Sequence, residues 1–346
     1  MHMARVLACL LSAAALAALP APYGPCCASP NEQLATSAAN ELATSGNQLL
    51  SGGRPLFLQG LSLFDALGDT PPRDDVLDRL RSWGVNDVRV WADWRRPVYD
   101  ADGRLTAAGA RCLVALARRL EARGLVFELV LLRPGQLPGQ SAARFTSAAA
   151  RERAVANLTR AMLPFRLALF DVFNEHDHPH GPITHADAGR LRDIVKDIDP
   201  ARLVTMSSTG SHIVGPDGSI SAADGANLRA EVLETRVDIV AVHLPRTDDW
   251  ARATQSRVLA LRATLQSMRL VVPVYLNEEN RAGAGGPTPA AEDYWRAAQG
   301  AKAAGAVGWV FHTDAGFDLT AHPFLAALRP PERRALEGLS AHLRDP

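Results

Sequence analysis

Two apolar stretches that end in the same dipeptide decide how this chain is expected to fold: LALFDVFNE at residues 167–175 and VVPVYLNE at residues 271–278. Each has the length of a buried strand, and each places a glutamate, Glu175 or Glu278, at the end of that strand. A carboxylate there is costly to bury but useful chemically, because burial and a second nearby carboxylate push the two pKa values apart. The chain between the two glutamates has room for three strand–helix units of roughly 34 residues each, which indicates a barrel.

The rest of the chain repeats this alternation of short apolar runs and longer amphipathic segments. The candidate strands cover residues 56–61, 87–91, 126–132, 167–173, 203–206, 239–243, 271–276 and 307–311. The candidate helices cover residues 76–83, 107–123, 148–163, 186–197, 250–268, 290–304 and 323–343. Gly84, Gly124 and Gly305 stand where helices would stop before the next strand. The pattern predicts a single α/β domain, a (β/α)8 TIM barrel over residues 54–346, with a doubly wound open sheet as the alternative.

Composition is that of an ordinary globular protein. The chain has 346 residues, of which 47% are hydrophobic and 21% charged, and its formal net charge is zero. Because no basic surplus is present, a nucleic-acid partner is not expected. The four cysteines match neither a disulfide framework nor a zinc site.

The first residues resemble an export signal. His2 and Arg5 precede an apolar stretch at residues 6–19, and small residues and prolines follow. This order predicts a secretory signal peptide at residues 1–28 and a secreted or periplasmic protein. A membrane anchor is the competing interpretation, but about 14 apolar residues are fewer than the roughly 20 that a spanning helix needs, so no stable membrane span is expected. Residues 29–53 are polar and small and are interpreted as a linker.

Polar and aromatic residues lie at or near the ends of the predicted strands. In a TIM barrel these ends meet at one face, where the active site is built. The candidate site residues are Asp65, Arg89, Trp91, Trp94, Asn174, Glu175, His243, Glu278, Trp309 and His312. Together they supply two carboxylates, an arginine, an amide, imidazoles and tryptophans at one rim. This combination favours a catalytic cleft over a purely structural rim.

Five motifs carry a resemblance to a known family set: GRPLFLQG at 53–60, GVNDVRVW at 84–91, FNE at 173–175, PVYLNE at 273–278 and GWVFH at 308–312. With these motifs the chain resembles glycoside hydrolase clan A, the retaining TIM-barrel glycosidases that include the cellulase and mannanase families. The resemblance runs from about residue 54 to residue 324. In that clan the acid/base glutamate follows an asparagine at strand 4 and the nucleophilic glutamate ends strand 7, as Asn174, Glu175 and Glu278 do here.

The resemblance implies a secreted hydrolase that cleaves β-glycosidic bonds of a poly- or oligosaccharide with retention, without a cofactor and without a metal. A retaining glycosidase needs two carboxyl groups about 5–5.5 Å apart. Glu278 would be the nucleophile, kept ionised by Arg89, and Glu175 would be the general acid and then the base. Asn174 would bind the sugar 2-hydroxyl. Trp91 and Trp94 would either stack on sugar rings or be buried beneath the next helix.

The chain also departs from the clan. Many members have His-x-Tyr at the end of strand 6, where the tyrosine supports the nucleophile, but this chain has His243, Leu244 and Pro245. The tryptophan that forms the floor of the sugar site at strand 8 is replaced by His312. Because strand side chains alternate, only one of two adjacent glutamates can face the cleft, and Glu279 is interpreted as a partner of Arg281 or of solvent.

Two other functions stay open. A carbohydrate-binding pseudoenzyme on the same barrel would account for the missing supporting residues. A metal-dependent barrel hydrolase would use the cluster of His176, Asp177, His178 and His180. Barrel amidohydrolases, however, place a His-x-His pair on strand 1, where this chain reads FLQG at residues 57–60. Glucan, mannan, galactan and smaller glycosides all remain candidate substrates, and the oligomeric state is not defined.

Overall fold

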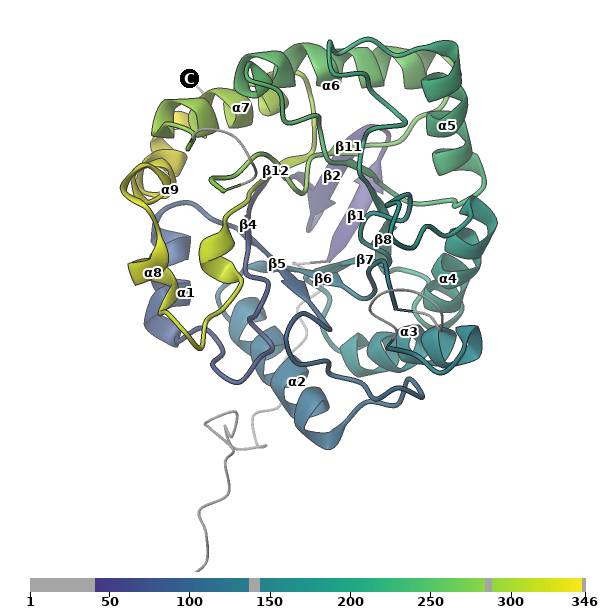
Figure 1. Ribbon diagram of the computed structural model, residues 1–346, viewed down its shortest axis with the longest axis vertical. Helices are drawn as coiled ribbons and strands as arrows, with labels where there is room; N and C mark the ends of the chain where they lie inside the picture. Colours follow the sequence, from purple (N-terminus) through teal and green to yellow (C-terminus); the bar gives the residue numbers. More distant parts are fainter. Residues whose placement is uncertain (1–40, 137–143, 284–287, 344–346) are drawn as a thin grey trace, which may run out of the picture.

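A computed structural model describes residues 41–136, 144–283 and 288–343, and it has the predicted barrel (Figure 1). The barrel strands are β4 (Leu58–Ser62), β5 (Asp87–Trp91), β6 (Val126–Val130), β7 (Ala168–Asp171), β8 (Leu203–Thr205), β9 (Ser207–Ser208), β10 (Val240–Val242), β11 (Val274–Tyr275) and β12 (Gly308–Phe311). They pair in parallel, in the orders β12-β4-β5-β6-β7-β8 and β9-β10-β11. β9 follows β8 after one residue, and a parallel bridge between Leu276 and Trp309 joins β11 to β12. The ring is therefore closed, and the TIM-barrel prediction is confirmed.

Helices surround the barrel. They are α1 (Asp74–Ser82), α2 (Ala107–Glu121), α3 (Ala148–Met162), α4 (His185–Ile198), α5 (Ala222–Leu233), α6 (Trp250–Ser267), α7 (Ala291–Ala303), α8 (Phe324–Ala327) and α9 (Pro330–Leu343), with a 3-10 turn at Asp314–Gly316. Gly84, Gly124 and Gly305 follow α1, α2 and α7 with positive φ angles, a conformation that glycine adopts without strain. The predicted helix stops are therefore confirmed.

Two helical segments differ from the sequence analysis. α5 was not predicted, because only Leu228 and Glu231 of its residues are buried, which is too few to give a clear helical period. The predicted helix at 323–343 is divided into α8 and α9. The division falls just before Pro330, because a proline disfavours helical geometry in the residue that precedes it.

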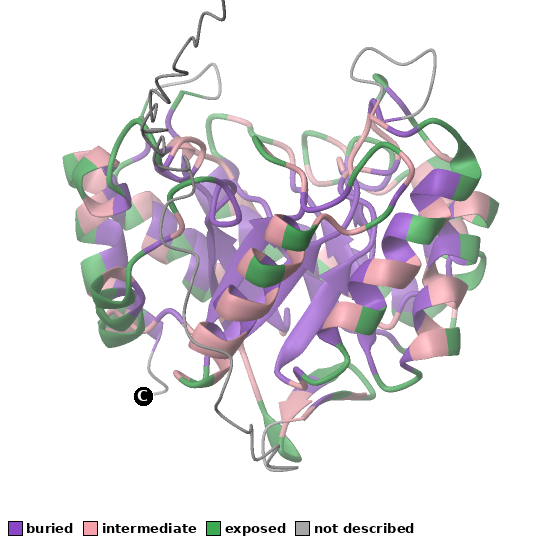
Figure 2. Cartoon of the chain, turned by 90° about the horizontal axis from the view of Figure 1, so that it is seen from below, coloured by how far each residue is buried: buried purple, intermediate pink, exposed green. Residues whose placement is uncertain are grey.

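The buried apolar residues form two main layers. The outer layer lies between the strands and the helices, and Figure 2 shows a buried interior enclosed by helices whose outer faces are exposed. The inner layer fills the amino end of the barrel and includes Leu58, Val126, Leu169, Ile239 and Val310. Because side chains alternate along a strand, strands such as β4, β6 and β12 contribute to both layers. The apolar filling at one end leaves the carboxyl ends of the strands for polar residues.

A small antiparallel sheet packs against the amino end of the barrel. It consists of β1 (Leu42–Ser45), β2 (Gln48–Ser51) and β3 (Arg54–Pro55). Leu42 and Leu49 of this sheet are buried and belong to the inner apolar layer. The prediction of a linker over residues 29–53 is therefore wrong for residues 42–53, whose apolar side chains help to fill the barrel. Residues 29–40, and the signal peptide predicted at 1–28, lie outside the described residues.

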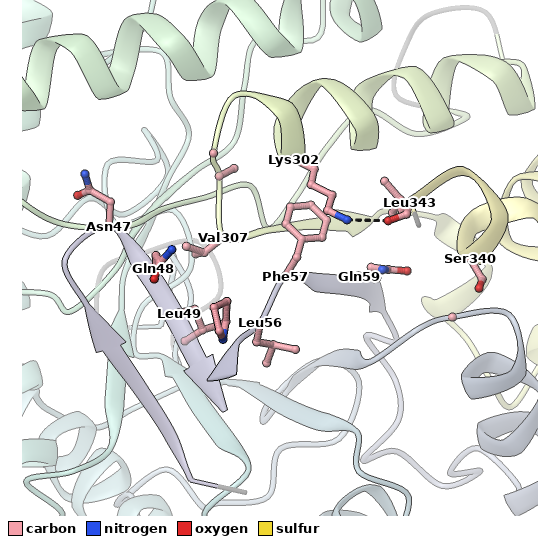
Figure 3. A pocket seen from close by; sticks show the side chains of 14 residues that line it. Asn47, Gln48, Leu49, Leu56, Phe57, Gln59, Lys302, Val307, Ser340 and Leu343 are labelled. Atoms are coloured by element: carbon pink, nitrogen blue, oxygen red, sulfur yellow. Dashed lines mark hydrogen bonds between the residues drawn. The ribbon is translucent and has the colours of Figure 1, made fainter. Parts of the chain in front are cut away.

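A pocket of about 580 Å³ lies beside this sheet (Figure 3). Its walls include Asn47 and Gln48 of the sheet, Phe57 and Leu343, and Lys302 of α7 donates a hydrogen bond to the carbonyl oxygen of Leu343 at 2.7 Å. The pocket is at the amino ends of the strands and so is separate from the predicted active face. In the part of the chain that the structure describes, no helix is long and apolar enough to cross a membrane.

We expect the Leu49→Ala substitution to lower the free energy of unfolding by about 2–5 kcal/mol, the usual range for removing a buried leucine side chain. Urea unfolding followed by circular dichroism measures this change. Gln48→Ala is the matched control, because Gln48 is exposed in the same strand. Equal and small effects of the two substitutions would mean that residues 42–51 do not belong to the folded domain.

Candidate active site

Arg89 lies at the centre of the polar cluster at the carboxyl end of the barrel. It projects from β5, is fully buried, and donates hydrogen bonds to three carboxylates. Nε donates to Glu128 Oε1 at 2.9 Å, Nη2 to Asp171 Oδ2 at 2.6 Å and Nη1 to Glu278 Oε2 at 3.0 Å. Burial opposes the charge on Arg89, but the three carboxylates outweigh it and raise the pKa of the guanidinium. The cluster therefore fixes Arg89 as a permanent cation beneath Glu278.

Glu278 follows β11, and both of its carboxylate oxygens are engaged. Oε2 accepts from Arg89, and Oε1 accepts from Nη2 of Arg246 at 3.1 Å, with Nε2 of His312 at 3.5 Å. Burial would raise the pKa of Glu278, but the positive charges of His243, Arg89 and Arg246 hold it well below its usual range. Burial and the arginines in turn hold the pKa of His312 well below its usual range, so this imidazole is neutral. His243 and the two arginines therefore keep Glu278 ionised.

Glu175 faces Glu278 across the cleft. Its backbone has a φ of 49°, in the left-handed region that a glutamate rarely adopts, and its N–H donates to Ser207 Oγ at 3.1 Å. This conformation turns a partly exposed side chain toward Glu278 and His243. One oxygen of each glutamate and one nitrogen of His243 all lie within 4.8 Å of one another. This upper limit is shorter than the roughly 6.5–9.5 Å of inverting glycosidases and agrees with the closer carboxyl groups of retaining ones.

Asn174 and His243 complete the polar surroundings of the two glutamates. Oδ1 of Asn174 accepts from Arg89 Nη2 at 2.7 Å, which leaves Nδ2 as the end of the amide available to a sugar hydroxyl. Nδ1 of His243 lies 3.1 Å from Oε1 of Glu175. Burial lowers the pKa of His243, but the carboxylates of Glu278 and Glu175 outweigh burial and raise it. The imidazole can therefore donate a hydrogen bond to Glu175.

Aromatic side chains form one wall of the site. Trp91 stacks on Phe64 with ring centroids 3.6 Å apart, and it is almost fully buried. Trp94 is partly exposed and donates from Nε1 to the carbonyl oxygen of Phe317 at 2.9 Å. Of the two predicted outcomes for the tryptophans, burial describes Trp91, whereas Trp94 keeps an exposed surface.

These residues border a cleft of about 480 Å³. Its lining consists of Phe64, Trp91, Trp94, Arg133, Pro134, Gly135, Asn174, Glu175, His178, His180, Glu278, Arg281, His312 and Phe317. The cleft has an aromatic wall, two carboxylates and several cationic or imidazole groups. It therefore offers both a flat apolar surface and acid–base groups to one ligand.

Two predicted site residues lie elsewhere. Trp309 is fully buried and packs beside Phe311 in the layer under the helices, so it does not line the cleft. Asp65 is also buried, and its Oδ2 accepts from the N–H of Leu319 at 3.1 Å. Burial raises the pKa of Asp65 to about 6. Contrary to the sequence analysis, neither residue lines the cleft.

Glu279 is also placed differently from the sequence analysis. It is only 2% exposed, so it does not face solvent. Arg281 makes its hydrogen bond to His312, and the arginines that act on Glu279 are Arg246 and Arg257. Glu279 is therefore a buried carboxyl group behind the cleft.

Three charged partners of Arg89 and Glu278 were missed by the sequence analysis. Glu128 and Asp171 are charged residues inside apolar strands, and each accepts a hydrogen bond from Arg89. A carboxylate within an apolar run is a signal that could have identified both. Arg246 lies in the loop after β10, and no periodic pattern indicates where a loop side chain points.

Two groups of described residues have the spacing of metal ligands. One is Glu175, His243 and Glu278, but the positive charges of the two arginines bound to Glu278 disfavour a metal ion there. The other is His176, His185 and Glu231, outside the cleft, where His176 Nε2 lies 2.6 Å from a Glu231 oxygen.

The histidine cluster considered in the sequence analysis is not brought to one point. His178 and His180 line the cleft, whereas His176 is directed at Glu231, and Asp177 accepts hydrogen bonds from Ser208 and Thr209.

Comparison with known proteins supports the fold. No protein-family model matches the chain, and no curated protein matches its sequence. Among solved structures, an endo-1,4-β-mannanase from Rhizomucor miehei matches with a TM-score of 0.62 and 12% identity, over 88% of this chain and 99% of that one. A β-mannanase from the blue mussel Mytilus edulis matches with a TM-score of 0.57 and 17% identity, over 88% and 98%. The catalytic domain of a Thermobifida fusca endoglucanase matches with a TM-score of 0.60 and 17% identity, over 87% of this chain and 98% of that one.

These identities are too low to carry more than the fold. The resemblance to clan A is therefore confirmed at the level of the barrel, which this chain shares with mannanases and endoglucanases. The chemistry has to be argued from the site itself.

The buried Glu279 predicts how stability depends on pH. Burial raises its pKa from 4.5 to about 7 in the folded protein, so the folded state binds this proton more tightly than the unfolded state does. The contribution of Glu279 to stability is therefore present below about pH 4.5 and is lost as the pH rises to about 7. We expect Glu279→Gln to match the wild type near pH 4.5 and to be about 2–4 kcal/mol more stable at pH 8.

Urea unfolding at the two pH values measures this difference. Glu337→Gln is the control, because Glu337 is exposed on α9. If the unfolding free energies of Glu279→Gln and the wild type differed by the same amount at both pH values, the assignment would be contradicted.

Proposed function

We propose that the protein is a secreted or periplasmic glycoside hydrolase that cleaves β-glycosidic bonds with retention of configuration. The observation that carries this proposal is the pair Glu175 and Glu278, whose carboxylate oxygens approach within 4.8 Å in unlike environments. Glu278 is ionised between two arginines, and Glu175 is partly exposed beside a histidine. Two carboxyl groups with different surroundings are what a two-step glycosidase requires.

The first step forms a covalent intermediate. Glu278 attacks the anomeric carbon while Glu175 gives its proton to the departing glycosidic oxygen, so that a glycosyl ester forms as the glycosidic bond breaks. Nδ2 of Asn174 donates to the sugar 2-hydroxyl, and this bond strengthens as positive charge develops on the ring.

The second step releases the sugar. Glu175, now ionised, takes a proton from water, and the resulting oxygen nucleophile displaces Glu278 from the anomeric carbon. Two displacements on opposite faces restore the original configuration. Trp94 supplies an apolar surface for a sugar ring, in accord with the exposed part of its side chain.

A carbohydrate-binding pseudoenzyme is the second candidate function. It is favoured by the hydrogen bond from Arg246 to Glu278 Oε1, which leaves the carboxylate less nucleophilic. It is also favoured by the residue at the strand-6 position, where Leu244 and Pro245 stand in place of a supporting tyrosine.

The proposal of export depends on the signal peptide predicted at residues 1–28. The choice of candidate substrates depends on the fold. The matching structures are named as mannanases and endoglucanases, so mannans and glucans enter the first substrate panel together with galactans.

The two glutamates are expected to fail in different ways. Glu278→Gln should remove hydrolysis of every substrate, because no glycosyl ester can form. Glu175→Gln should lower kcat/KM by about 10²–10⁴-fold on substrates that need a proton on the leaving group, and far less on activated aryl glycosides. Added azide should restore turnover to Glu175→Gln only.

Steady-state kinetics on aryl β-glycosides and on the polysaccharide panel measures these effects. Glu337→Gln, on the exposed face of α9, controls for the substitution itself. Hydrolysis by Glu278→Gln at the wild-type rate would disprove the assignment, and bound sugar without any hydrolysis by the wild type would favour the pseudoenzyme.

A further inference from the structure

The oxygen of Glu278 that is free of Arg89 is held by a second arginine. Arg246 reaches Oε1 from the loop after β10, at 3.1 Å, and about a third of its side chain remains exposed. Oε1 is the oxygen left to attack a sugar, because Oε2 is bound to Arg89. A cationic hydrogen bond on this atom lowers its nucleophilicity. Arg246 therefore has to turn to another partner when the substrate reacts.

A third arginine, Arg281, lies near Arg246 and Glu278 and is not paired with a carboxylate among the described residues. Arg281 lines the cleft, donates from Nε to Nε2 of His312 at 3.1 Å, and packs over the ring of Phe317. Among the described residues, no carboxylate lies within 4.0 Å of its guanidinium. Burial and the neighbouring positive charge of Arg246 lower the pKa of Arg281. The carboxylates that act on Arg281, those of Glu278 and Asp314, therefore lie beyond ion-pair distance.

The other arginine of the cleft does not share this property. Arg133 is paired with the buried Asp93 at 3.1 Å, and Asp93 also lies 3.7 Å from Arg144. Arg246 and Arg281 thus place two positive charges on the side of the cleft where Glu278 lies, and the one carboxylate paired with either of them among the described residues is that of Glu278 itself. A neutral sugar offers this pair no counter-charge, whereas an anionic group would satisfy both guanidinium groups by charge-assisted hydrogen bonds.

We propose that the substrate is an acidic saccharide, and that Arg246 and Arg281 bind the anionic group of the sugar next to the scissile bond. This inference rests on the glycosidase function proposed above. A uronosyl carboxylate or a sulfate ester has the required chemistry. On binding, the anion takes the hydrogen bonds of Arg246 and thereby releases Oε1 of Glu278 for attack. Acidic substrates are thus preferred in kcat as well as in KM, because the anion frees the nucleophile in addition to holding the sugar.

Matched aryl β-glycosides test the proposal. Neutral, uronide and 6-sulfated forms of the gluco, manno and galacto series are compared in kcat/KM for the wild type, Arg246→Gln and Arg281→Gln. Arg252→Gln is the control, because Arg252 is exposed on α6 and points to no part of the cleft lining. Titration calorimetry with the corresponding free acidic and neutral sugars measures binding independently of hydrolysis.

We expect the wild type to prefer one acidic form over its neutral partner by about 10- to 100-fold, the range that charge-assisted hydrogen bonds supply. The two variants should lose this preference, and Arg252→Gln should keep it. Whether the uronide or the sulfate is preferred identifies the anionic group. If Arg246 only positioned Glu278, Arg246→Gln would instead lower hydrolysis of acidic and neutral forms by the same factor, which would overturn the proposal.

The remaining outcomes separate this inference from the proposed function. Hydrolysis of neutral glycosides that depends on Glu278, without a preference for acidic ones, would overturn the inference and leave the glycosidase intact. Binding of an acidic sugar that depends on Arg281, without hydrolysis of any form, would support the anion site and overturn the glycosidase. If the protein neither bound nor hydrolysed any acidic form, the inference would be overturned.

Discussion

One guanidinium shared by three carboxylates is the interaction on which this active face depends. Arg89 is fully buried, and a buried charge is very costly unless it is paired and hydrogen-bonded. Its partners come from β6, from β7 and from the end of β11, so the charge cluster joins four strands of the barrel. Tyr275 and Asn277 hydrogen-bond to Glu128 and extend the cluster into the barrel interior. The position of Glu278 is therefore fixed by its ion pair with the buried Arg89.

The surroundings of Glu278 also mark where this chain departs from the clan it resembles. A neutral His312 lies where a tryptophan floor is expected, and Arg246 approaches from the loop where a supporting tyrosine would be. Arg246 donates a hydrogen bond to Oε1 of Glu278, and Nε2 of His312, which accepts from Arg281, lies 3.5 Å from the same oxygen. The barrel and the two glutamates are thus kept, while the groups that select the sugar are different. Fold and catalytic pair would determine the reaction class, and the loop cations would determine the substrate.

Much of this arrangement could be predicted from the sequence, because strand ends are marked by a change from apolar to polar residues. Arg89, Glu175 and Glu278 were expected to meet, since the carboxyl ends of parallel strands lie at one edge of a barrel. The strand pattern does not say which side chains turn away, so Trp309 and Asp65 were misplaced. Loops have no period, and for that reason Arg246 was missed. α5 and the sheet at residues 42–55 bury too few apolar residues for their pattern to be recognised.

The central claim is that Glu278 forms a covalent bond with the sugar, and trapping that bond tests it most directly. A 2-deoxy-2-fluoro aryl glycoside of the preferred sugar slows both steps, because fluorine destabilises the positively charged transition state, while its good leaving group keeps formation of the ester faster than hydrolysis. Intact mass followed by peptide mapping locates the label. The account predicts one glycosyl group per protein, on Glu278. A label on Glu279 or Glu175, or product release with no labelled protein, would contradict it.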